Sequence, residues 1–138
     1  MRLLGVDFGF KRIGLAIAES DFGIVTPKPA IPATGTLRID ADNLESSFKK
    51  EGAELLVLGL PLEEDGSAGK MARVCQTVAG LLRAKGIAVE LVDERYSSVE
   101  AEAALRVEDL KASERRKLRD GEAAGILLER YLEGLEEA

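Results

Sequence analysis

The apolar residues change their spacing once along this chain, and that change constrains the fold more than any single motif. Up to about residue 31, three strand-like segments follow one another at 2–7, 13–19 and 23–31, with only short turns between them. Strands joined by such short turns pair antiparallel. Pro27 and Pro29 favour an edge position for the third segment, because proline cannot donate a ladder hydrogen bond.

Beyond this point, helix-like and strand-like segments alternate. Apolar residues recurring at helical spacing predict helices, and short apolar runs predict buried strands. The predicted helices are 40–50, 67–85, 97–106 and 119–132, and the predicted strands are 55–58 and 87–92. The resulting order, β-β-β-α-β-α-β-α-α, predicts one α/β domain over residues 1–138. We expect a mixed five-stranded sheet with helices on both faces.

The complete lack of histidine excludes whole classes of chemistry. Ser-His-Asp and Cys-His catalysis and histidine-ligated zinc sites all require it. The single cysteine, Cys75, excludes an intrachain disulfide framework, and its place in the apolar stripe of the 67–85 helix indicates a core residue. Any acid–base or metal chemistry must therefore rest on carboxylates, lysine, tyrosine or cysteine.

The charge balance restricts the class of protein. With 25 acidic and 19 basic residues the net charge is −6, which disfavours a nonspecific nucleic-acid coat protein. It leaves room for an enzyme whose basic residues gather around one site. No apolar run approaches the roughly 20 residues that span a bilayer, and the first residues lack the layout of a signal peptide. We expect a cytoplasmic protein with no membrane partner.

Three acidic positions could carry chemistry: Asp7, the pair Asp93–Glu94, and Asp120. Asp7 ends an apolar strand beside Gly9, where a phosphate or metal could approach the backbone; the alternative is an aspartate that caps a tight hairpin. The pair Asp93–Glu94 also follows a strand. The alternative interpretation is that it belongs to a solvated loop that begins a helix. Asp120 shares a helical face with core residues, where it could bind a ligand. The alternative interpretation is that its side chain caps the helix.

These carboxylates lie far apart in sequence but could converge at one edge of the sheet, where ligands of α/β folds gather. Hard cations such as Mg²⁺ or Mn²⁺ prefer carboxylate oxygens. Two such ions about 4 Å apart can activate water and stabilise a leaving oxygen in phosphodiester hydrolysis. The sequence therefore favours a metal-dependent nuclease.

Basic residues accompany each proposed carboxylate and could hold a phosphate backbone. The predicted nucleic-acid contacts are Lys11, Arg12, Arg95, Arg115, Arg116, Lys117 and Arg119. For the run 111–119 the alternative is a solvated helix face. Ser67, near the predicted start of a helix, could place a phosphate at that helix N-terminus, or could simply form a capped turn.

Four segments in this order resemble the YqgF (RuvX) family of bacterial ribonuclease H-like proteins over nearly the whole chain. The segments are Gly5-Val6-Asp7-Phe8-Gly9-Phe10-Lys11-Arg12-Ile13-Gly14, Gly59-Leu60-Pro61-Leu62 with Asp65-Gly66-Ser67, Asp93-Glu94-Arg95, and Asp120 with Ala124, Ile126, Leu127 and Leu128. Members of that family are described as Holliday junction resolvases and as nucleases that mature the 5′ end of pre-16S ribosomal RNA. The resemblance implies a ribonuclease H-like fold and metal-binding, catalytic roles for Asp7, Glu94 and Asp120.

Two other classes of protein stay open at this point. The opening Asp-x-Gly hairpin also occurs in actin-like nucleotide-binding proteins, which usually need two such domains. A noncatalytic nucleic-acid-binding regulator on the same fold is the other alternative. For the nuclease, the sequence does not choose between a structured RNA precursor and branched DNA, or between a monomer and a homodimer.

Overall fold

The computed structural model describes residues 1–63, 65–93 and 112–137, and in the last helix it describes the side chains of residues 121–134. Its strands are β1 (Arg2–Phe8), β2 (Arg12–Glu19), β3 (Ile24–Pro32), β4 (Leu55–Leu60) and β5 (Val89–Asp93). They form one sheet in the order β3-β2-β1-β4-β5. The first three strands pair antiparallel, whereas β1, β4 and β5 run parallel. The predicted mixed five-stranded sheet, with the proline-containing strand at an edge, is confirmed.

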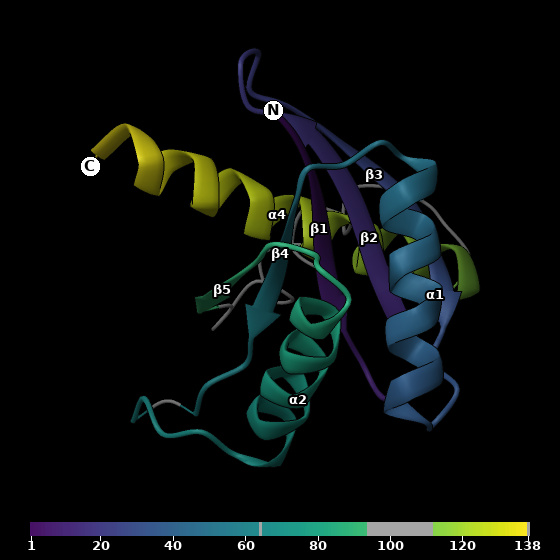
Figure 1. The fold of residues 1–138 in the computed structure, drawn as a ribbon. Helices are drawn as coiled ribbons and strands as arrows, with labels where there is room; N and C mark the ends of the chain where they lie inside the picture. Colours follow the sequence, from purple (N-terminus) through teal and green to yellow (C-terminus); the bar gives the residue numbers. More distant parts are fainter. Residues whose placement is uncertain (64, 94–111, 138) are drawn as a thin grey trace.

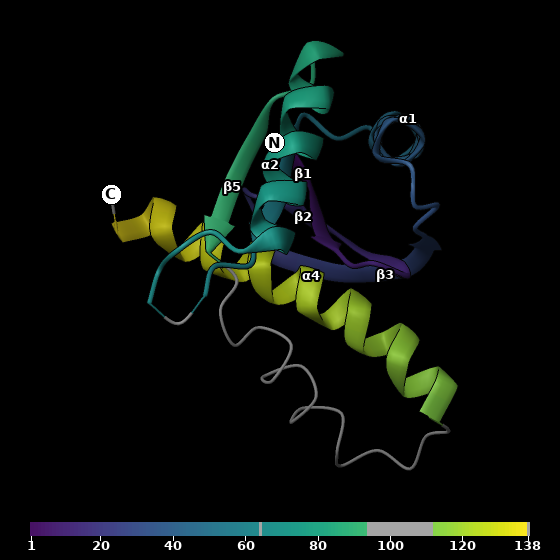
Figure 2. The same ribbon diagram turned by 90° about the horizontal axis from the view of Figure 1, so that it is seen from below.

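Helices cover both faces of this sheet, as predicted. The helices α1 (Leu37–Lys50) and α2 (Lys70–Ala84) lie on one face, and α4 (Ala112–Glu137) crosses the other (Figures 1 and 2). Strand residues alternate between the two faces. On β1, Leu4, Val6 and Phe8 join the α1/α2 core, whereas Leu3 belongs to the α4 core.

Glycines let α4 lie unusually close to the strands. A Cβ atom on Gly5 of β1 would stand 2.6 Å from Leu128 Cγ and 2.9 Å from the Ala124 carbonyl oxygen. On the helix itself, a Cβ on Gly121 would stand 3.0 Å from Pro27 Cβ, so this helix touches β3 as well as β1. Close backbone approach of this kind needs glycine.

Three predicted helix starts are wrong. The helix expected from residue 40 begins three positions earlier, at Leu37. The helix expected from residue 67 begins at Lys70, because the Asp65 carboxylate accepts hydrogen bonds from both the backbone N–H and the hydroxyl of Ser67 and forms a turn there. The last helix, expected from 119, begins at Ala112. Its first turns carry no apolar stripe to reveal them, although their Ala, Glu, Arg, Lys and Leu residues are good helix formers. The helix predicted over 97–106 lies outside the described residues.

Candidate active site

The carboxyl ends of β1, β4 and β5 meet at one edge of the sheet, which lies in the lower part of Figure 1. Here β1 turns into β2 through a tight hairpin, in which the Gly9 N–H donates to the Arg12 carbonyl over 3.0 Å. A Cβ on Gly9 would lie 2.6 Å from that carbonyl oxygen, so the turn requires glycine. Asp7 stands half-buried just before the turn and pairs with Gly14, which adds no side chain beside it.

The alternation along the strands separates the two aspartates at this edge. Asp7 shares the parity of Leu3 and therefore lies on the α4 face. Asp93 shares the parity of Val89 and Leu91, which pack in the α1/α2 core. Their strands are also separated by β4, which at about 4.8 Å per strand puts them roughly 10 Å apart. Asp93 and Asp7 therefore lie on opposite faces of the sheet, on strands that are not neighbours.

Contacts of α4 with the sheet indicate where position 120 lies. Ala124 and Leu128 lie against Gly5 of β1, and position 120 precedes Ala124 by one helical turn in the same row. Along the neighbouring row, Gly125 meets Val25 and Gly121 meets Pro27.

The strand register gives these contacts a direction. Val25 pairs with Ala18, level with Leu3 at the start of β1, whereas Pro27 pairs with Ala16, level with Gly5. Earlier positions of α4 therefore lie closer to the carboxyl end of β1, which places position 120 nearer to that end than Ala124 is. Asp120 also lies eight positions after the helix start, so its interpretation as a helix cap is wrong.

Of the predicted phosphate-binding residues, two have described side chains. Lys11 is exposed in the hairpin turn and Arg12 is half-buried at the start of β2, so both lie within five positions of Asp7. The helix α4 carries Arg115, Arg116, Lys117 and Arg119 in its first turns, and their side chains lie outside the description. Glu94 and Arg95 lie outside the described residues.

The sequence predicts that Ser67 lies either at a phosphate-binding helix N-terminus or in a simple turn, and the structure shows a turn. It is closed by Asp65, and the N-cap position of α2 falls on Gly69, without a side-chain cap hydrogen bond. Sequence reasoning missed Lys70, whose ammonium lies 5.9 Å from the centroid of the Phe10 ring. This residue begins α2, and no spacing in the sequence indicates that α2 starts beside the β1–β2 hairpin.

The donor chemistry of this edge fits a hard divalent cation. Asp7 offers carboxylate oxygens, the chain has no histidine, and its one cysteine is buried in the α1/α2 core. Within the ranges whose side chains are described, no group of three Asp, Glu, His or Cys side chains could hold a metal ion. A three-ligand site would therefore need ligands from outside those ranges, which is where the predicted ligands Glu94 and Asp120 lie.

Comparison with known proteins decides the family. Residues 1–134 match the family model described as "RuvX: Holliday junction resolvase". The chain belongs to the RuvX family. It is 39% identical over 135 residues to the "Putative pre-16S rRNA nuclease" of Anaeromyxobacter sp. (strain Fw109-5), covering 97% of this chain and 98% of that protein. The protein of the same name from Picosynechococcus sp. (strain ATCC 27264) is also 39% identical, over 94% of this chain and 90% of the relative.

Solved structures confirm the ribonuclease H-like fold of the RuvX member. Thermus thermophilus RuvC, solved in complex with a Holliday junction substrate, superposes with a TM-score of 0.56 at 13% identity, covering 92% of this chain and 91% of RuvC. The yeast mitochondrial Holliday junction resolvase gives 0.51 at 9% identity, covering 98% and 81%. A ROK family protein from Streptococcus pneumoniae gives 0.52 at 16%, but this chain covers only 39% of it. The chain is thus a member of a nuclease family. Among the helices of the described residues, none is long and apolar enough to cross a membrane.

Proposed function

We propose that this protein hydrolyses nucleic-acid phosphodiesters with Mg²⁺ or Mn²⁺ held by Asp7, Glu94 and Asp120. The observation that carries the proposal is the position of Asp7. It ends the central strand of the sheet, on the face that α4 crosses, and the row of α4 residues above β1 leads back to Asp120. Two of the three carboxylates thus come from elements that pack directly against each other.

Glu94 is the preferred third ligand over its neighbour Asp93. The Asp93 side chain belongs to the α1/α2 side of β5, away from Asp7. Glu94, the next residue along the chain, is the carboxylate that the family resemblance implies.

Each part of this edge has a chemical task in the proposed reaction. When bound, divalent cations supply an activated water and stabilise the leaving oxygen. The three carboxylates would hold the cations, and the β1–β2 ladder fixes the backbone of Asp7 for this role. Lys11 and Arg12 bind phosphates of the strand being cut and orient its backbone. Arg95 and the basic turns of α4 extend the same contact along the nucleic acid.

The substrate we propose is a structured ribosomal RNA precursor, cut near the 5′ end of pre-16S rRNA in the cytoplasm. Support comes from relatives near 40% identity that carry the pre-16S rRNA name over almost their whole length. Holliday junction resolution is the second candidate, supported by the description of the family model. Purified protein should be given both substrates in Mg²⁺, in Mn²⁺ and in EDTA, since preferential cutting of one identifies the substrate.

Charge-neutral variants test the carboxylates. Asp7→Asn keeps the shape of the side chain but removes a charge and a strong ligand, so cleavage should fall by a hundredfold or more, on the order of removing one transition-state contact. Asp120→Asn should behave alike, and Glu94→Gln should be milder. Asp93→Asn is the matched control, because it removes a neighbouring carboxylate from the opposite face and should leave single-turnover cleavage by the folded protein unchanged.

Measurements of binding and of cleavage separate the other two classes of protein. A noncatalytic regulator would bind both nucleic acids without cutting either in any metal. An actin-like protein would bind a nucleoside triphosphate instead. Full cleavage by folded Asp7→Asn protein would rule out the proposed metal site.

A further inference from the structure

An aromatic side chain stands at the tip of the β1–β2 hairpin, three residues beyond Asp7. Phe10 is 66% exposed, although it lies between the buried ends of two core strands. An apolar ring left in water adds little to the stability of the fold. Its position at the proposed site of cleavage therefore points to a contact with something that binds there.

The hairpin holds this ring on a well-anchored backbone. On one side, the Gly9 N–H donates to the Arg12 carbonyl over 3.0 Å. On the other, the Lys11 carbonyl accepts a hydrogen bond of 2.9 Å from the Ala33 N–H, just after β3. Because both neighbours of Phe10 are tied to strands, its backbone loses little freedom when a ligand packs against the ring.

Two lysines neighbour the ring, one in sequence and one in space. Lys11 is the next residue and is exposed. The ammonium of Lys70, from the first turn of α2, lies 5.9 Å from the ring centroid. An aromatic face beside cations is the combination that proteins use to hold single-stranded nucleic acid, because the ring stacks on a base while the cations meet phosphates.

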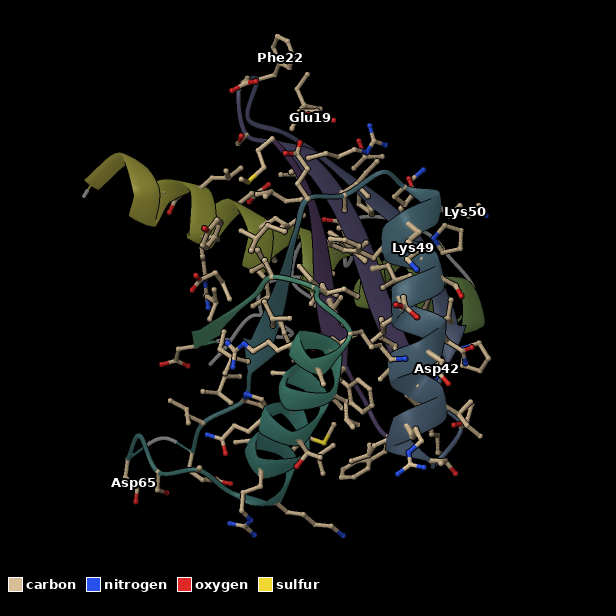
Figure 3. The ribbon with its side chains drawn as sticks, viewed as in Figure 1. Glu19, Phe22, Asp42, Lys49, Lys50 and Asp65 are labelled. Carbon is tan, nitrogen blue, oxygen red and sulfur yellow. The ribbon has the colours of Figure 1, made fainter. Side chains whose placement is uncertain are left out.

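The opposite end of the sheet provides an internal comparison. Phe22, in the β2–β3 hairpin, is 76% exposed and lies at the other end of the molecule from Asp65 (Figure 3). Its neighbours are acidic: Asp21 precedes it, and its backbone N–H donates to the Glu19 carbonyl. The two exposed phenylalanines thus differ in their neighbours. Lysines lie beside Phe10, whereas the acidic groups near Phe22 are ion-paired, Asp21 with the N-terminal ammonium and Glu19 with Arg2. The lysines beside Phe10 would attract a phosphate backbone.

We propose that Phe10 stacks on an unpaired base of the nucleic acid next to the scissile phosphodiester, while Lys11 and Lys70 hold the flanking phosphates. This inference rests on the proposed nuclease function and adds a specificity to it. The protein would favour sites where a strand leaves a duplex, because a base inside a duplex cannot stack on a side chain without being displaced.

Fluorescence offers a test that does not depend on cleavage. The chain has no tryptophan, so Phe10→Trp and Phe22→Trp each create a single reporter. In EDTA, a single strand of about a dozen nucleotides, as RNA or as DNA, should quench the emission of Phe10→Trp much more than the blunt duplex of the same sequence does. The emission of Phe22→Trp should respond to none of these probes. If no probe changes the emission of Phe10→Trp, or if both variants respond equally, the proposal is overturned.

Affinity measurements distinguish stacking from general binding. Phe10→Ala should weaken single-strand binding by roughly fivefold to a hundredfold without changing its salt dependence, because no charge is lost. Phe10→Tyr should restore binding and Phe10→Leu should not. Lys70→Ala should instead flatten the salt dependence. Wild-type affinity in folded Phe10→Leu would contradict stacking.

Cleavage is scored separately, so the two proposals can fail independently. Quenching of Phe10→Trp by a single strand, together with a wild-type protein that cuts nothing under any metal, would refute the nuclease and leave the stacking intact. Normal cleavage by Phe10→Ala of both a duplex and a duplex with an unpaired flank would refute the role of stacking in specificity and leave the nuclease intact.

Discussion

On the face covered by α1 and α2, the core is built mostly from large side chains such as Leu44, Leu58 and Leu82, whereas the face covered by α4 combines leucines with alanines and closely packed glycines. Large side chains fill the space between layers and can adjust by small rotations. Glycines let one element approach another closely, so the distance between α4 and β1 depends on the Leu128 side chain and the Ala124 carbonyl that lie against Gly5. The first arrangement mainly stabilises the fold, and the second fixes the position of a helix relative to Asp7.

The largest expected loss of stability follows from a cavity on the α1/α2 face. Leu82 is fully buried near the end of α2, and its carbonyl accepts a hydrogen bond from Ile87 ahead of β5, far from the hairpin that follows Asp7. Leu82→Ala should lower the free energy of unfolding by about 2–5 kcal/mol in urea titrations. Cleavage per folded molecule should be unchanged, and Leu82→Met, which conserves volume, should cost less than about 1.5 kcal/mol. A drop in single-turnover rate as large as that of Asp7→Asn would show that the two faces are not separate in function.

A smaller loss of stability with a larger loss of activity is expected on the α4 face. In Gly5→Ala the new methyl group would stand 2.6 Å from Leu128 Cγ and 2.9 Å from the Ala124 carbonyl oxygen, so α4 must shift. The cost should be about 1–3 kcal/mol. Because displacement of a catalytic group by about 1 Å can cost a hundredfold in rate, cleavage should fall by that order.

An exposed glycine of α2 provides the matched control for that variant. A Cβ on Gly80 would meet no atom within 4 Å, and alanine there should stabilise the helix by about 0.5–1 kcal/mol. Cleavage by Gly80→Ala should equal that of the wild type. If Gly5→Ala also cleaves normally, the spacing of α4 does not position the site.

A polar contact at the margin of the α1/α2 face should matter less. Asp40 is 1% exposed, and its Oδ1 accepts hydrogen bonds from the Thr34 N–H and hydroxyl at 2.8 and 2.9 Å. Asp40→Ala should cost about 1 kcal/mol, toward the low end for an unpaired donor, since the exposed Thr34 can turn to water. A double-mutant cycle with Thr34→Ala measures the coupling, and a coupling of zero would mean that Asp40 acts through burial alone.

Alkaline pH should weaken both faces slightly. A hydrogen bond to Asp42, with the charges of Asp42 and Glu45, raises the pKa of Lys85 above its usual 10.5 and so links α2 to α1. Burial, with the nearby Glu90 charge, raises the pKa of Tyr131 of α4 above 10.0. Each folded-state pKa is raised, so each contribution is complete below the unfolded pKa and is lost as the pH rises through the folded one.

Melting temperatures should therefore fall as the pH rises beyond about 10. In Lys85→Met, the part of this fall in melting temperature that comes from the α1/α2 face should disappear. In Tyr131→Phe, the part that comes from the α4 face should disappear. An identical pH profile in both variants and the wild type would assign the decline to other groups.

The strands, the sheet and the helices α1 and α2 could be predicted because apolar periodicity reports which side of each element is buried. That signal is missing from residues 112–119, where charged residues dominate, so the start of α4 was wrong by seven positions and Asp120 was open to interpretation as a cap. Asp40 shows a second limit of sequence-based prediction. An acidic residue in the first turn of a helix normally predicts an exposed side chain, but Asp40 is buried. The meeting of Phe10 with Lys70 depends on how two distant segments pack, which no local pattern contains.

The position of α4 far along the chain from the strands that it covers has a consequence for biosynthesis. The strands β1 and β2 are synthesised about 100 residues earlier, which at about 5–20 residues per second means roughly 5–20 seconds. During that interval Leu3, Ala16 and Ala18 have no helix over them, so an apolar face of the sheet is exposed. The open edge is a second hazard, because unpaired backbone groups of an edge strand invite pairing with other chains. Pro27, Pro29 and Pro32 lie in β3, at the open edge of the nascent sheet, where they offer no N–H for a further strand. The prolines thus oppose strand addition at the β3 edge in the growing chain as in the finished one, whereas the apolar face is covered only when α4 packs.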